Sequence, residues 1–315
     1  MIEQFKKDVE QGLSQNPKSL SSKYFYDAIG DELFVDIMNM PEYYLTDAEL
    51  EIFRDKTKEL IKHFSIDENT HFQLIELGAG DGFKTKELLK ELVQKEFKFD
   101  YLPIDISDHT LEKLETTLNS EIPKLSVKTQ QGDYFQVLAS LKDPKQRRIV
   151  LFLGSSIGNL TDDLSTKFLS ELSDNLSPGD RLLLGVDLIK EERIVLPAYN
   201  DAKGITSKFN LNLLHRINNE LKADFDLDSF AHKPEYDQNE GIARSFLTSL
   251  KKQTVHIASI NKSFQFEENE KIQTEISRKY NDKIIAEITS RTNFFLEQKI
   301  MDSKEYFADY MLLRK

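Results

Sequence analysis

The chain has 315 residues, 39% of them hydrophobic and 30% charged, with no cysteine and a formal net charge of −12 at pH 7. This length favours one large domain or two closely associated ones, and the apolar content supports a sizeable core rather than global disorder. The negative charge repels phosphate backbones and anionic lipids, so nucleic-acid or membrane-surface binding is disfavoured as the main task.

The lack of cysteine excludes disulfides, thiolate metal sites and cysteine nucleophiles, and it fits a reducing cytoplasm. The first residues, MIEQFKKDVEQGLSQNPKSL, have no apolar segment typical of a signal peptide, and no run approaches the ~18 apolar residues of a membrane span. The histidines show no pair at metal-ligand spacing. We therefore expect a cytoplasmic protein with no metal site, no nucleic-acid partner and no membrane contact, and the charge favours a monomer.

The N-terminal part, residues 1–60, is predicted to be mostly helical, with an aromatic-rich loop SSKYFYDAIGDELFVDIMNMPEYYLT. From about residue 72 to 187, short apolar runs then alternate with helical patterns. Near-continuously apolar strands separated by helices predict a parallel sheet covered on both faces, which is a doubly wound α/β domain. The strands are expected at 72–77, 101–106, 125–133, 147–156 and 181–189, and the helices at 84–97, 107–120 (capped by Ser107) and 161–176 (capped by Thr161).

The remaining segments have a different pattern. Residues 190–230 contain a long helical stretch around FNLNLLHRINNEL, and residues 241–279 alternate like antiparallel strands with one wet face. The tail YFADYMLLRK is expected to return to the large sheet as a last strand. We therefore predict a doubly wound domain from residues 60–190 plus 281–315, and a second, α+β domain from residues 1–59 plus 191–280.

Three glycines at alternate positions, Gly78, Gly80 and Gly82, lie in the stretch LIELGAGDGFKTK between the first strand and the first helix of this pattern. Glycine tolerates positive φ and has no Cβ, so a ligand can approach the backbone closely. A turn between a strand end and a helix start is where nucleoside ligands bind in such sheets. The turn is therefore a candidate cofactor site, although a glycine triplet alone also fits an ordinary tight turn.

Carboxylates lie at the ends of the next two predicted strands. Asp105 could accept both hydroxyls of a ribose, and Asp133 could accept from an adenine amino group; each could instead only cap a turn or helix. The glycine spacing is G-x-G-x-G with Glu76 upstream, and not the G-x-x-G ending of the dinucleotide fingerprint. This spacing resembles motif I of class I S-adenosylmethionine methyltransferases. S-adenosylmethionine is therefore preferred over a nicotinamide dinucleotide, which stays a distant alternative.

A longer resemblance narrows the family. The stretches YFYDAIGDELFVDIMNMPEYYLTDAE, LGSSIGNL, LLLGVDLIKE, AYNDAKGITSKFNLNLLHRIN and TEISRKY together resemble the L-histidine Nα-methyltransferases of ergothioneine biosynthesis. They occur in that family's order and span about residues 18–280. The resemblance implies a Rossmann-like class I methyltransferase domain with a substrate-binding domain. The family also includes relatives that act on other amino acids, such as tryptophan, so membership alone does not fix the substrate.

The resemblance also implies site residues. S-adenosylmethionine would be held by a set near the glycine turn: Gly78, Gly80, Lys84, Asp105, Asp133 and Tyr134. Asn159 and Tyr199 would bind the substrate α-carboxylate. The α-amine would be surrounded by Tyr26, Phe34 and Gly154, with Tyr43 on the imidazole side and Glu275 and Ser277 holding the imidazole. Among these, Tyr26, Asn159 and Tyr199 are the residues expected to serve catalysis.

Residue chemistry is consistent with these roles. Glu275 and Ser277 are two apart in a strand, so they share a face, and Ile276 is expected to point into the core. A carboxylate and a hydroxyl can pair with both imidazole nitrogens, whereas an indole offers one N–H. Alternatively, Glu275 is a solvated strand residue paired with Arg278 or Lys279, and Asn159 is a turn residue. The tyrosines suit a methylammonium product because ring faces attract positive charge, but they also suit an ordinary core.

Three functional hypotheses remain. The first is Nα-methylation of L-histidine in three rounds, giving the trimethylated betaine hercynine. The second is methylation of another amino acid, such as tryptophan, by a relative of the same family. The third is a catalytically silent S-adenosylmethionine-binding regulatory protein.

Overall fold

Two compact units make up the chain. The computed structural model describes residues 2–67, 69–140 and 146–315. Unit 1 comprises residues 1–44 and 190–278, and unit 2 comprises residues 45–189 and 279–315. Residues 45–59, which we expected in the α+β domain, thus cluster with the unit that holds the large sheet. Each unit has its own sheet and its own hydrophobic core.

The helices of both units are α1 (Ile2–Ser14), α2 (Ala28–Met38), α3 (Tyr44–Asp55), α4 (Thr57–Phe64), α5 (Thr85–Gln94), α6 (Asp108–Glu121), α7 (Tyr134–Ser140), α8 (Asp162–Asn175), α9 (Glu192–Val195), α10 (Ile205–Leu221) and α11 (Asp282–Thr289). The strands are β1 (Lys18–Ser19), β2 (Phe72–Leu77), β3 (Phe99–Asp105), β4 (Gln130–Gln131), β5 (Arg147–Phe152), β6 (Arg181–Asp187), β7 (Phe230–Asp237), β8 (Ile242–Ser249), β9 (Gln253–Ile257), β10 (Lys262–Phe266), β11 (Lys271–Arg278), β12 (Phe294–Met301) and β13 (Phe307–Arg314).

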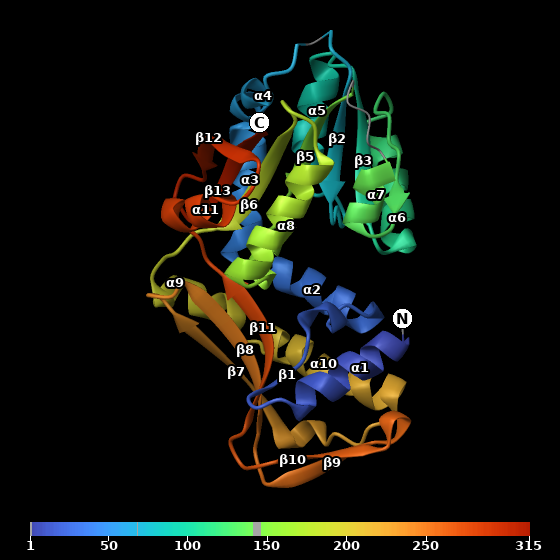
Figure 1. Ribbon diagram of the computed structural model, residues 1–315, viewed down its shortest axis with the longest axis vertical. Helices are drawn as coiled ribbons and strands as arrows, with labels where there is room; N and C mark the ends of the chain where they lie inside the picture. The colour runs from blue at the N-terminus through green and yellow to red at the C-terminus, as the bar shows by residue number, and fades with distance from the viewer. Residues whose placement is uncertain (1, 68, 141–145) are drawn as a thin grey trace. The chain divides into compact units, whose positions relative to one another are not determined.

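Unit 2 contains a seven-stranded sheet in the order β12-β13-β6-β5-β2-β3-β4 (Figure 1). Strands β2 to β6 run parallel, while β13 is antiparallel to both β6 and β12. In β6, all seven residues of RLLLGVD are buried, as expected for a strand covered on both faces. The predicted doubly wound class I methyltransferase-like fold, including the return of the tail to the sheet, is confirmed.

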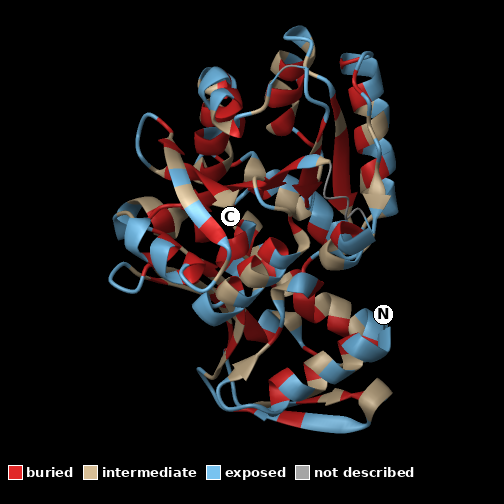
Figure 2. Cartoon of the chain, turned by 45° about the horizontal axis from the view of Figure 1, so that its top comes forward, coloured by how far each residue is buried: buried red, intermediate tan, exposed pale blue. Residues whose placement is uncertain are grey.

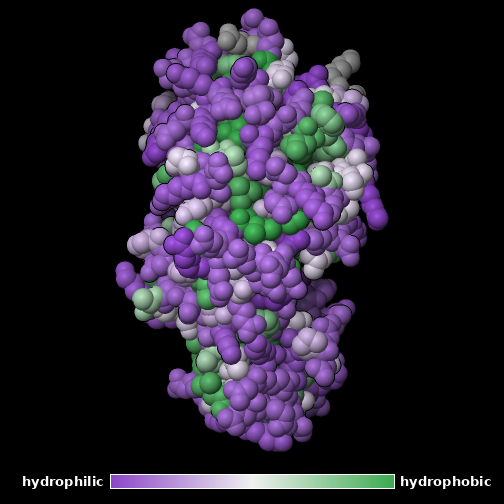
Figure 3. All heavy atoms as spheres, turned by 90° about the vertical axis from the view of Figure 1, so that its left-hand side faces the viewer, coloured by the Kyte–Doolittle hydropathy of each residue, from purple (hydrophilic) through white to green (hydrophobic). Residues whose placement is uncertain are grey.

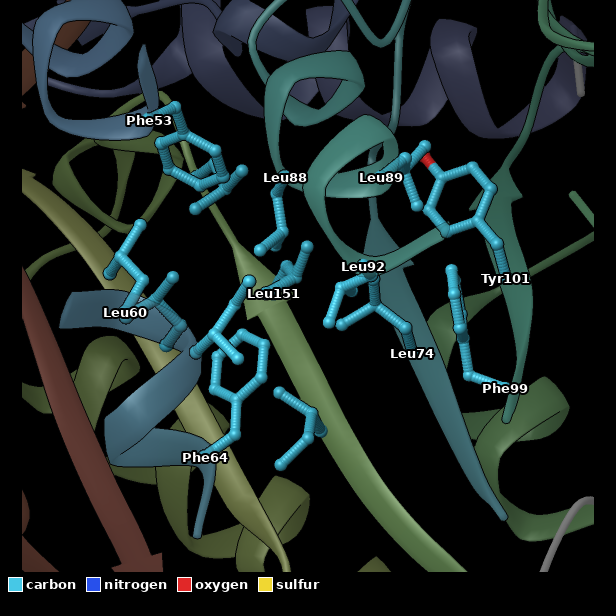
Figure 4. Packing of buried hydrophobic residues seen from close by; sticks show 14 of the residues in the cluster. Phe53, Leu60, Phe64, Leu74, Leu88, Leu89, Leu92, Phe99, Tyr101 and Leu151 are labelled. Atoms are coloured by element: carbon cyan, nitrogen blue, oxygen red, sulfur yellow. The ribbon is translucent and has the colours of Figure 1, made fainter. Parts of the chain in front are cut away.

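Helices cover both faces of this sheet. One core cluster joins the sheet to α3, α4, α5 and α6, and a second joins it to α7, α8 and α11. Figure 4 shows the first cluster, in which Phe53, Leu60 and Leu88 pack toward Leu74 and Leu151 of the strands. In Figure 2 the strands are largely buried, whereas the outer helix faces are exposed. This three-layer packing leaves the strand ends as the places where polar groups can gather.

Local signals set several boundaries. The Ser107 hydroxyl accepts from the backbone N–H of Thr110 at 3.2 Å, and Thr161 accepts from that of Leu164 at 3.4 Å, so both predicted N-caps are confirmed. The third predicted strand, 125–133, is wrong in extent. Only Gln130–Gln131 form β4, apart from an isolated bridge at Val127, because this polar edge segment offers few apolar residues to bury.

Unit 1 contains a four-stranded sheet in the order β1-β11-β8-β7 and a separate β9–β10 hairpin. Strands β7, β8 and β11 are antiparallel, which confirms the antiparallel pattern predicted for residues 241–279. Apolar side chains of α1, α2 and α10 share one core cluster with β8 to β11. Sequence reasoning missed β7 here and β12 in unit 2.

The aromatic-rich loop predicted around residues 21–46 contains a helix instead. Asp27 caps α2, because its Oδ1 accepts from the backbone N–H of Gly30 at 2.8 Å and from the Asn212 side chain at 2.8 Å. A Cβ on Gly30 would lie 1.8 Å from the carbonyl oxygen of Phe25, so this first turn requires glycine. The cap and this close approach explain a helix that the aromatic residues concealed.

Hydrophilic residues dominate the face in Figure 3, with smaller apolar groups among them. No helix within the described ranges has the length and apolar character that a membrane crossing requires.

Candidate active site

The glycine turn follows β2, where the strand order of unit 2 reverses. Strand β2 pairs with β3 on one side and with β5 on the other. Open α/β sheets bind ligands beyond the carboxyl ends of strands at such a switch point. Gly78, Gly80 and Gly82 have φ angles of +71°, +55° and +63°. Residues with a Cβ adopt this left-handed region only at a cost, so the path of the turn depends on glycine.

The three glycines border different surroundings. A Cβ on Gly80 would have no atom within 4 Å, whereas one on Gly78 would lie 2.8 Å from the Tyr134 hydroxyl. A Cβ on Gly82 would lie 2.6 Å from Cδ1 of Leu114 in α6. Gly82 therefore has a packing reason to be glycine, and Gly80 is the position where the turn borders open space.

Two carboxylates lie at the neighbouring strand ends. Asp105 ends β3; its Oδ1 accepts from the backbone N–H of Ser107 at 3.0 Å, and its Oδ2 lies 3.5 Å from the backbone nitrogen of Gly80. Asp133 Oδ1 accepts from two backbone N–H groups at the start of α7, at 3.0 and 3.2 Å. Both carboxylates therefore perform local capping. Capping leaves each of them a second oxygen, and Asp105 directs its own toward the glycine turn.

Tyr134 links this group to the turn, because its hydroxyl lies beside Gly78. Burial, followed by the negative charges of Asp105 and Asp133, raises the pKa of the Tyr134 phenol to about 12. The phenol is therefore a neutral hydrogen-bond donor at physiological pH. Gly78, Gly80, Asp105, Asp133 and Tyr134, all predicted for the cofactor, thus gather around one turn.

Buried titratable side chains lie on both sides of the glycine turn in the sequence and make hydrogen bonds and an ion pair. Glu76, on β2, accepts hydrogen bonds from the Thr85 hydroxyl at 2.8 Å and from the Tyr101 phenol. Burial raises its pKa to about 7, despite these two hydrogen bonds. Lys84, also predicted for the cofactor, forms an ion pair with Glu49, a fully buried residue of α3 that sequence reasoning did not single out.

The loop after β5 carries the two predicted substrate residues of unit 2. Gly154 has a φ of +70°, and its backbone N–H donates to the Glu49 carboxylate, 3.0 Å from each oxygen. Asn159 ends the 3-10 helix Ser156–Asn159 and is exposed. This loop leaves β5 next to the glycine turn after β2, since the two strands are paired.

In unit 1, the predicted aromatic residues form one cluster. The Tyr26 and Phe34 rings meet edge to face, with centroids 5.5 Å apart, and Phe34 meets Tyr43 in the same way at 6.4 Å. Phe209 of α10 completes the cluster, 5.8 Å from Tyr26 and 5.9 Å from Phe34. Phe209 was missed because helical periodicity marks it only as a core position.

Glu275 lies within electrostatic reach of this cluster. Burial of the Tyr26 hydroxyl raises its pKa well above the usual range, and the negative charges of Glu275 and Asp31 raise it further. Tyr26 as a whole remains 42% exposed, and its raised pKa keeps the phenol protonated. Glu275 accepts from the Ser245 hydroxyl of β8 at 3.0 Å, a contact that holds its carboxylate in place.

A second polar group lies on the same strand as Glu275. The Tyr199 hydroxyl donates to Ser277 Oγ at 2.8 Å, and both residues are buried. His232 Nε2 lies 2.9 Å from the Tyr199 carbonyl oxygen. A bulge shifts the β11 register between Gln273 and Glu275, before both predicted residues. The expectation that Ile276 enters the core is wrong: it is half-buried, and Thr274 is the buried residue instead.

The residues around Gly80 fit S-adenosylmethionine. Gly80 leaves room for a ligand at the backbone, and Asp105, Asp133 and Tyr134 supply the acceptors and the donor that an adenosine group pairs with. A second group lies in unit 1 and consists of Glu275, Ser277, Tyr199 and the aromatic cluster. It combines one anion, hydroxyls and ring faces, so it suits a small polar molecule with a cationic part.

Comparisons with known proteins identify the family. Residues 5–314 match the family described as histidine-specific methyltransferase, SAM-dependent. The chain is 38% identical to the histidine N-alpha-methyltransferase of Mycolicibacterium smegmatis, over 91% of this chain and 88% of that protein. It is 36% identical to the protein of that name from Mycobacterium tuberculosis, over 89% and 86%.

A third relative is larger than this chain. Ergothioneine biosynthesis protein 1 of Schizosaccharomyces pombe is 29% identical over 98% of this chain and 40% of that protein. The predicted methyl donor, S-adenosylmethionine, is confirmed by the family match over nearly the whole chain. The chain belongs to the histidine-specific, S-adenosylmethionine-dependent methyltransferases.

Proposed function

We propose that this methyltransferase transfers three methyl groups to the α-amine of L-histidine and releases hercynine. The single observation that carries the substrate assignment is the pair Glu275 and Ser277 on β11. Their carboxylate and hydroxyl are held by Ser245 and Tyr199. Together they match the two nitrogens of an imidazole, one of which always carries a proton.

The α-amine must be neutral to attack a methyl group. Its reference pKa is about 8 in peptides, so it loses a proton before each transfer. S-adenosylmethionine supplies an electrophilic methyl on its sulfonium. Tyr26 acts as a hydrogen-bonding partner that orients the amine, because its raised pKa keeps the phenol protonated and unsuited to the role of a base. Water then takes the proton, and the residues contribute mainly alignment.

The α-carboxylate is assigned to Asn159 and Tyr199. An amide donor binds a carboxylate without adding a charge that would repel the sulfonium. Tyr199 donates its proton to Ser277 in this structure, so binding of a carboxylate requires that proton to turn toward the ligand. Gly154, in the same loop as Asn159, is assigned to the space around the amine.

Repeated methylation requires a site that tolerates a growing cation. Tyr26, Phe34 and Tyr43 present ring faces and edges in one cluster, and ring faces stabilise methylammonium groups. With the imidazole and carboxylate held, the amine can rotate between rounds. We propose that the enzyme works in the cytoplasm as a monomer, as the sequence predicts.

The competing hypotheses make distinct predictions for binding. An enzyme specific for tryptophan would bind that amino acid in preference to histidine, even though an indole offers only one N–H to Glu275 and Ser277. A silent binding protein would take the nucleoside without any amino acid.

Titration calorimetry tests these alternatives. The protein is saturated with S-adenosylhomocysteine and titrated with histidine and then with tryptophan, and the experiment is repeated with Glu275→Ala. We expect histidine to bind and the variant to lose about 10- to 100-fold in affinity, the usual range for a hydrogen bond to a charged group. Glu267→Ala, at an exposed ion pair of unit 1, is the matched control.

Binding of tryptophan in place of histidine, or of neither amino acid, contradicts the assignment. Mass spectrometry of the product made with excess methyl donor then counts the methyl groups. A product that stops at one or two contradicts the proposed trimethylation.

A further inference from the structure

A buried carboxylate connects the two loops of unit 2 that the proposed function uses. Glu49 of α3 is 0% exposed. Its carboxylate accepts from Lys84, which follows the glycine turn, and from the backbone N–H of Gly154 in the loop after β5. One side chain outside the β2–β5 segment thus contacts both loops at once.

The sheet makes room for this carboxylate. A Cβ on Gly185 of β6 would lie 2.1 Å from Glu49 Oε1 and 2.9 Å from Asp309 Oδ1. Gly185 and Asp309 are partners in the register of β6 and β13. Any larger residue at position 185 would displace Glu49, so the space left by the missing side chain in this fully buried strand is filled by the Glu49 carboxylate.

The three carboxyl groups around Lys84 differ in how far they are ionised. Its ammonium is faced by Glu49 from α3, Glu76 from β2 and Asp309 from β13. Burial raises the pKa of Asp309 well above its usual value, with the charge of Glu49 acting in the same direction. Neither Asp309 oxygen has a hydrogen-bond partner within the described part of the chain, which fits a neutral carboxyl group. Glu76, with its pKa of about 7, is only partly ionised near neutral pH.

Glu49 therefore supplies the main counter-charge. Burial works to lower the pKa of Lys84, but the nearby carboxyl groups together raise that pKa, and the charge and hydrogen bond of Glu49 are the largest of their contributions. A buried amine without such a partner loses its proton readily.

We propose that Glu49 is a positioning residue for S-adenosylmethionine binding. It keeps the Lys84 side chain charged and holds both that side chain and the Gly154 loop in position. The inference rests on the assignment of Lys84 to the cofactor in the proposed function. Glu49 itself need not touch the cofactor; it acts through Lys84 and through the backbone of Gly154.

The test is the pH dependence of S-adenosylhomocysteine affinity in Glu49→Gln, measured by calorimetry without amino acid. The variant keeps the size of the side chain and an acceptor for Gly154 but removes the charge. We expect wild-type affinity to stay level between about pH 8 and pH 9.5, where Glu76 is already ionised, and the affinity of the variant to fall about tenfold over the same range as Lys84 deprotonates.

Two further variants isolate the cause. In Lys84→Met/Glu49→Gln the affinity should be low but independent of pH, since no lysine remains to titrate. Asp180→Asn is the matched control. Asp180 is a buried carboxylate paired with Arg148 at the opposite, amino-terminal ends of β5 and β6. The Asp180→Asn variant should have a lower melting temperature but an unchanged affinity for S-adenosylhomocysteine.

A pH-independent affinity in Glu49→Gln, alongside weakened binding in Lys84→Met, overturns the role of Glu49 and leaves the proposed function intact. Unchanged binding in Lys84→Met overturns the assignment of Lys84 itself. If Glu49→Gln does not fold, carbon NMR of the lysine side chains in the wild type decides. Lys84, identified by its absence in Lys84→Met, should remain charged beyond about pH 10.5, and titration below about pH 9 contradicts the proposal.

Discussion

The two candidate half-sites differ in structure: one consists mainly of backbone turns, and the other mainly of side chains. In unit 2, the cofactor group consists of backbone turns at the ends of parallel strands, fixed by buried charges such as Glu76 and the Lys84–Glu49 pair. In unit 1, the amino-acid group consists of side chains on antiparallel strands and of aromatic rings from α2 and α10.

The difference matches what each ligand requires. A nucleoside is common to many enzymes and is recognised where a backbone can approach it, so glycine and strand ends suffice. One amino acid must be distinguished from nineteen others by side-chain chemistry, a role that the proposed function assigns to groups such as the Glu275 carboxylate. We expect substitutions around the glycine turn of unit 2 to act through stability and cofactor affinity, and those at Glu275 and Ser277 of unit 1 through the amino acid alone.

The largest expected effect concerns the buried charge of unit 2. The folded-state pKa of Glu76, about 7, exceeds its usual 4.5, so the folded state holds this proton more tightly than the unfolded state. The resulting stability is fully present below pH 4.5 and is lost as the pH rises through 7. The shift corresponds to about 3 kcal/mol.

Urea unfolding of the wild type and Glu76→Gln measures this effect. Between about pH 5 and pH 8.5, the free energy of unfolding should change in favour of the variant by up to about 3 kcal/mol. If the free energies of unfolding of the two proteins differ by the same amount at both pH values, Glu76 is ionised throughout, and its pKa is not raised in the folded state.

The second effect concerns backbone approach. Gly80→Ala places a methyl group in the open space beside the turn, and we expect S-adenosylhomocysteine affinity to fall about a hundredfold, or about 2.7 kcal/mol. Gly82→Ala is the matched control, because it has the same backbone requirement but meets Leu114. It should lower the melting temperature more and the affinity less. The reverse ranking would mean that the ligand lies over Gly82.

The smallest effect belongs to unit 1. Ser277→Ala removes the acceptor of the Tyr199 hydroxyl, and the KM for histidine should rise about tenfold, as expected for one lost hydrogen bond. S-adenosylhomocysteine affinity should not change. Ser263→Ala, at an exposed position of the β9–β10 hairpin, is the control. A loss of nucleoside affinity in Ser277→Ala would contradict the assignment of the cofactor and the amino acid to separate groups of residues.

The grouping of the candidate cofactor residues around one turn was predictable from the sequence, because its signals are local. Gly80 lies within a few residues of β2, and Asp105 ends β3; the apolar pattern of both strands is visible in the sequence, and Asp133 lies shortly after the polar β4. The parallel pairing of β2 with β3 and β5 then brings these ends to one edge. The short β4 was overestimated, since an edge strand needs few apolar residues and leaves a weak pattern.

The supporting residues were not predictable in this way. Glu49 lies 35 residues before Lys84, and nothing in its helical context distinguishes it from an exposed glutamate. Ser245 and Phe209 reach the site only through the pairing of β8 with β11 and the packing of α10. Residues such as Glu275 were located by family resemblance, because no spacing rule connects them to the glycine turn.

The interleaved course of the chain has a consequence for biosynthesis. Strand β13 completes the sheet of unit 2 by pairing with β6, across the whole inserted segment 190–278, and β1, near the start of the chain, pairs with the distant β11 (Figure 1). Such distant pairings make folding slow. Neither unit is encoded by one continuous stretch of the gene. On the ribosome, β6 must therefore wait, with its β13 edge unpaired, until the last strand has been translated.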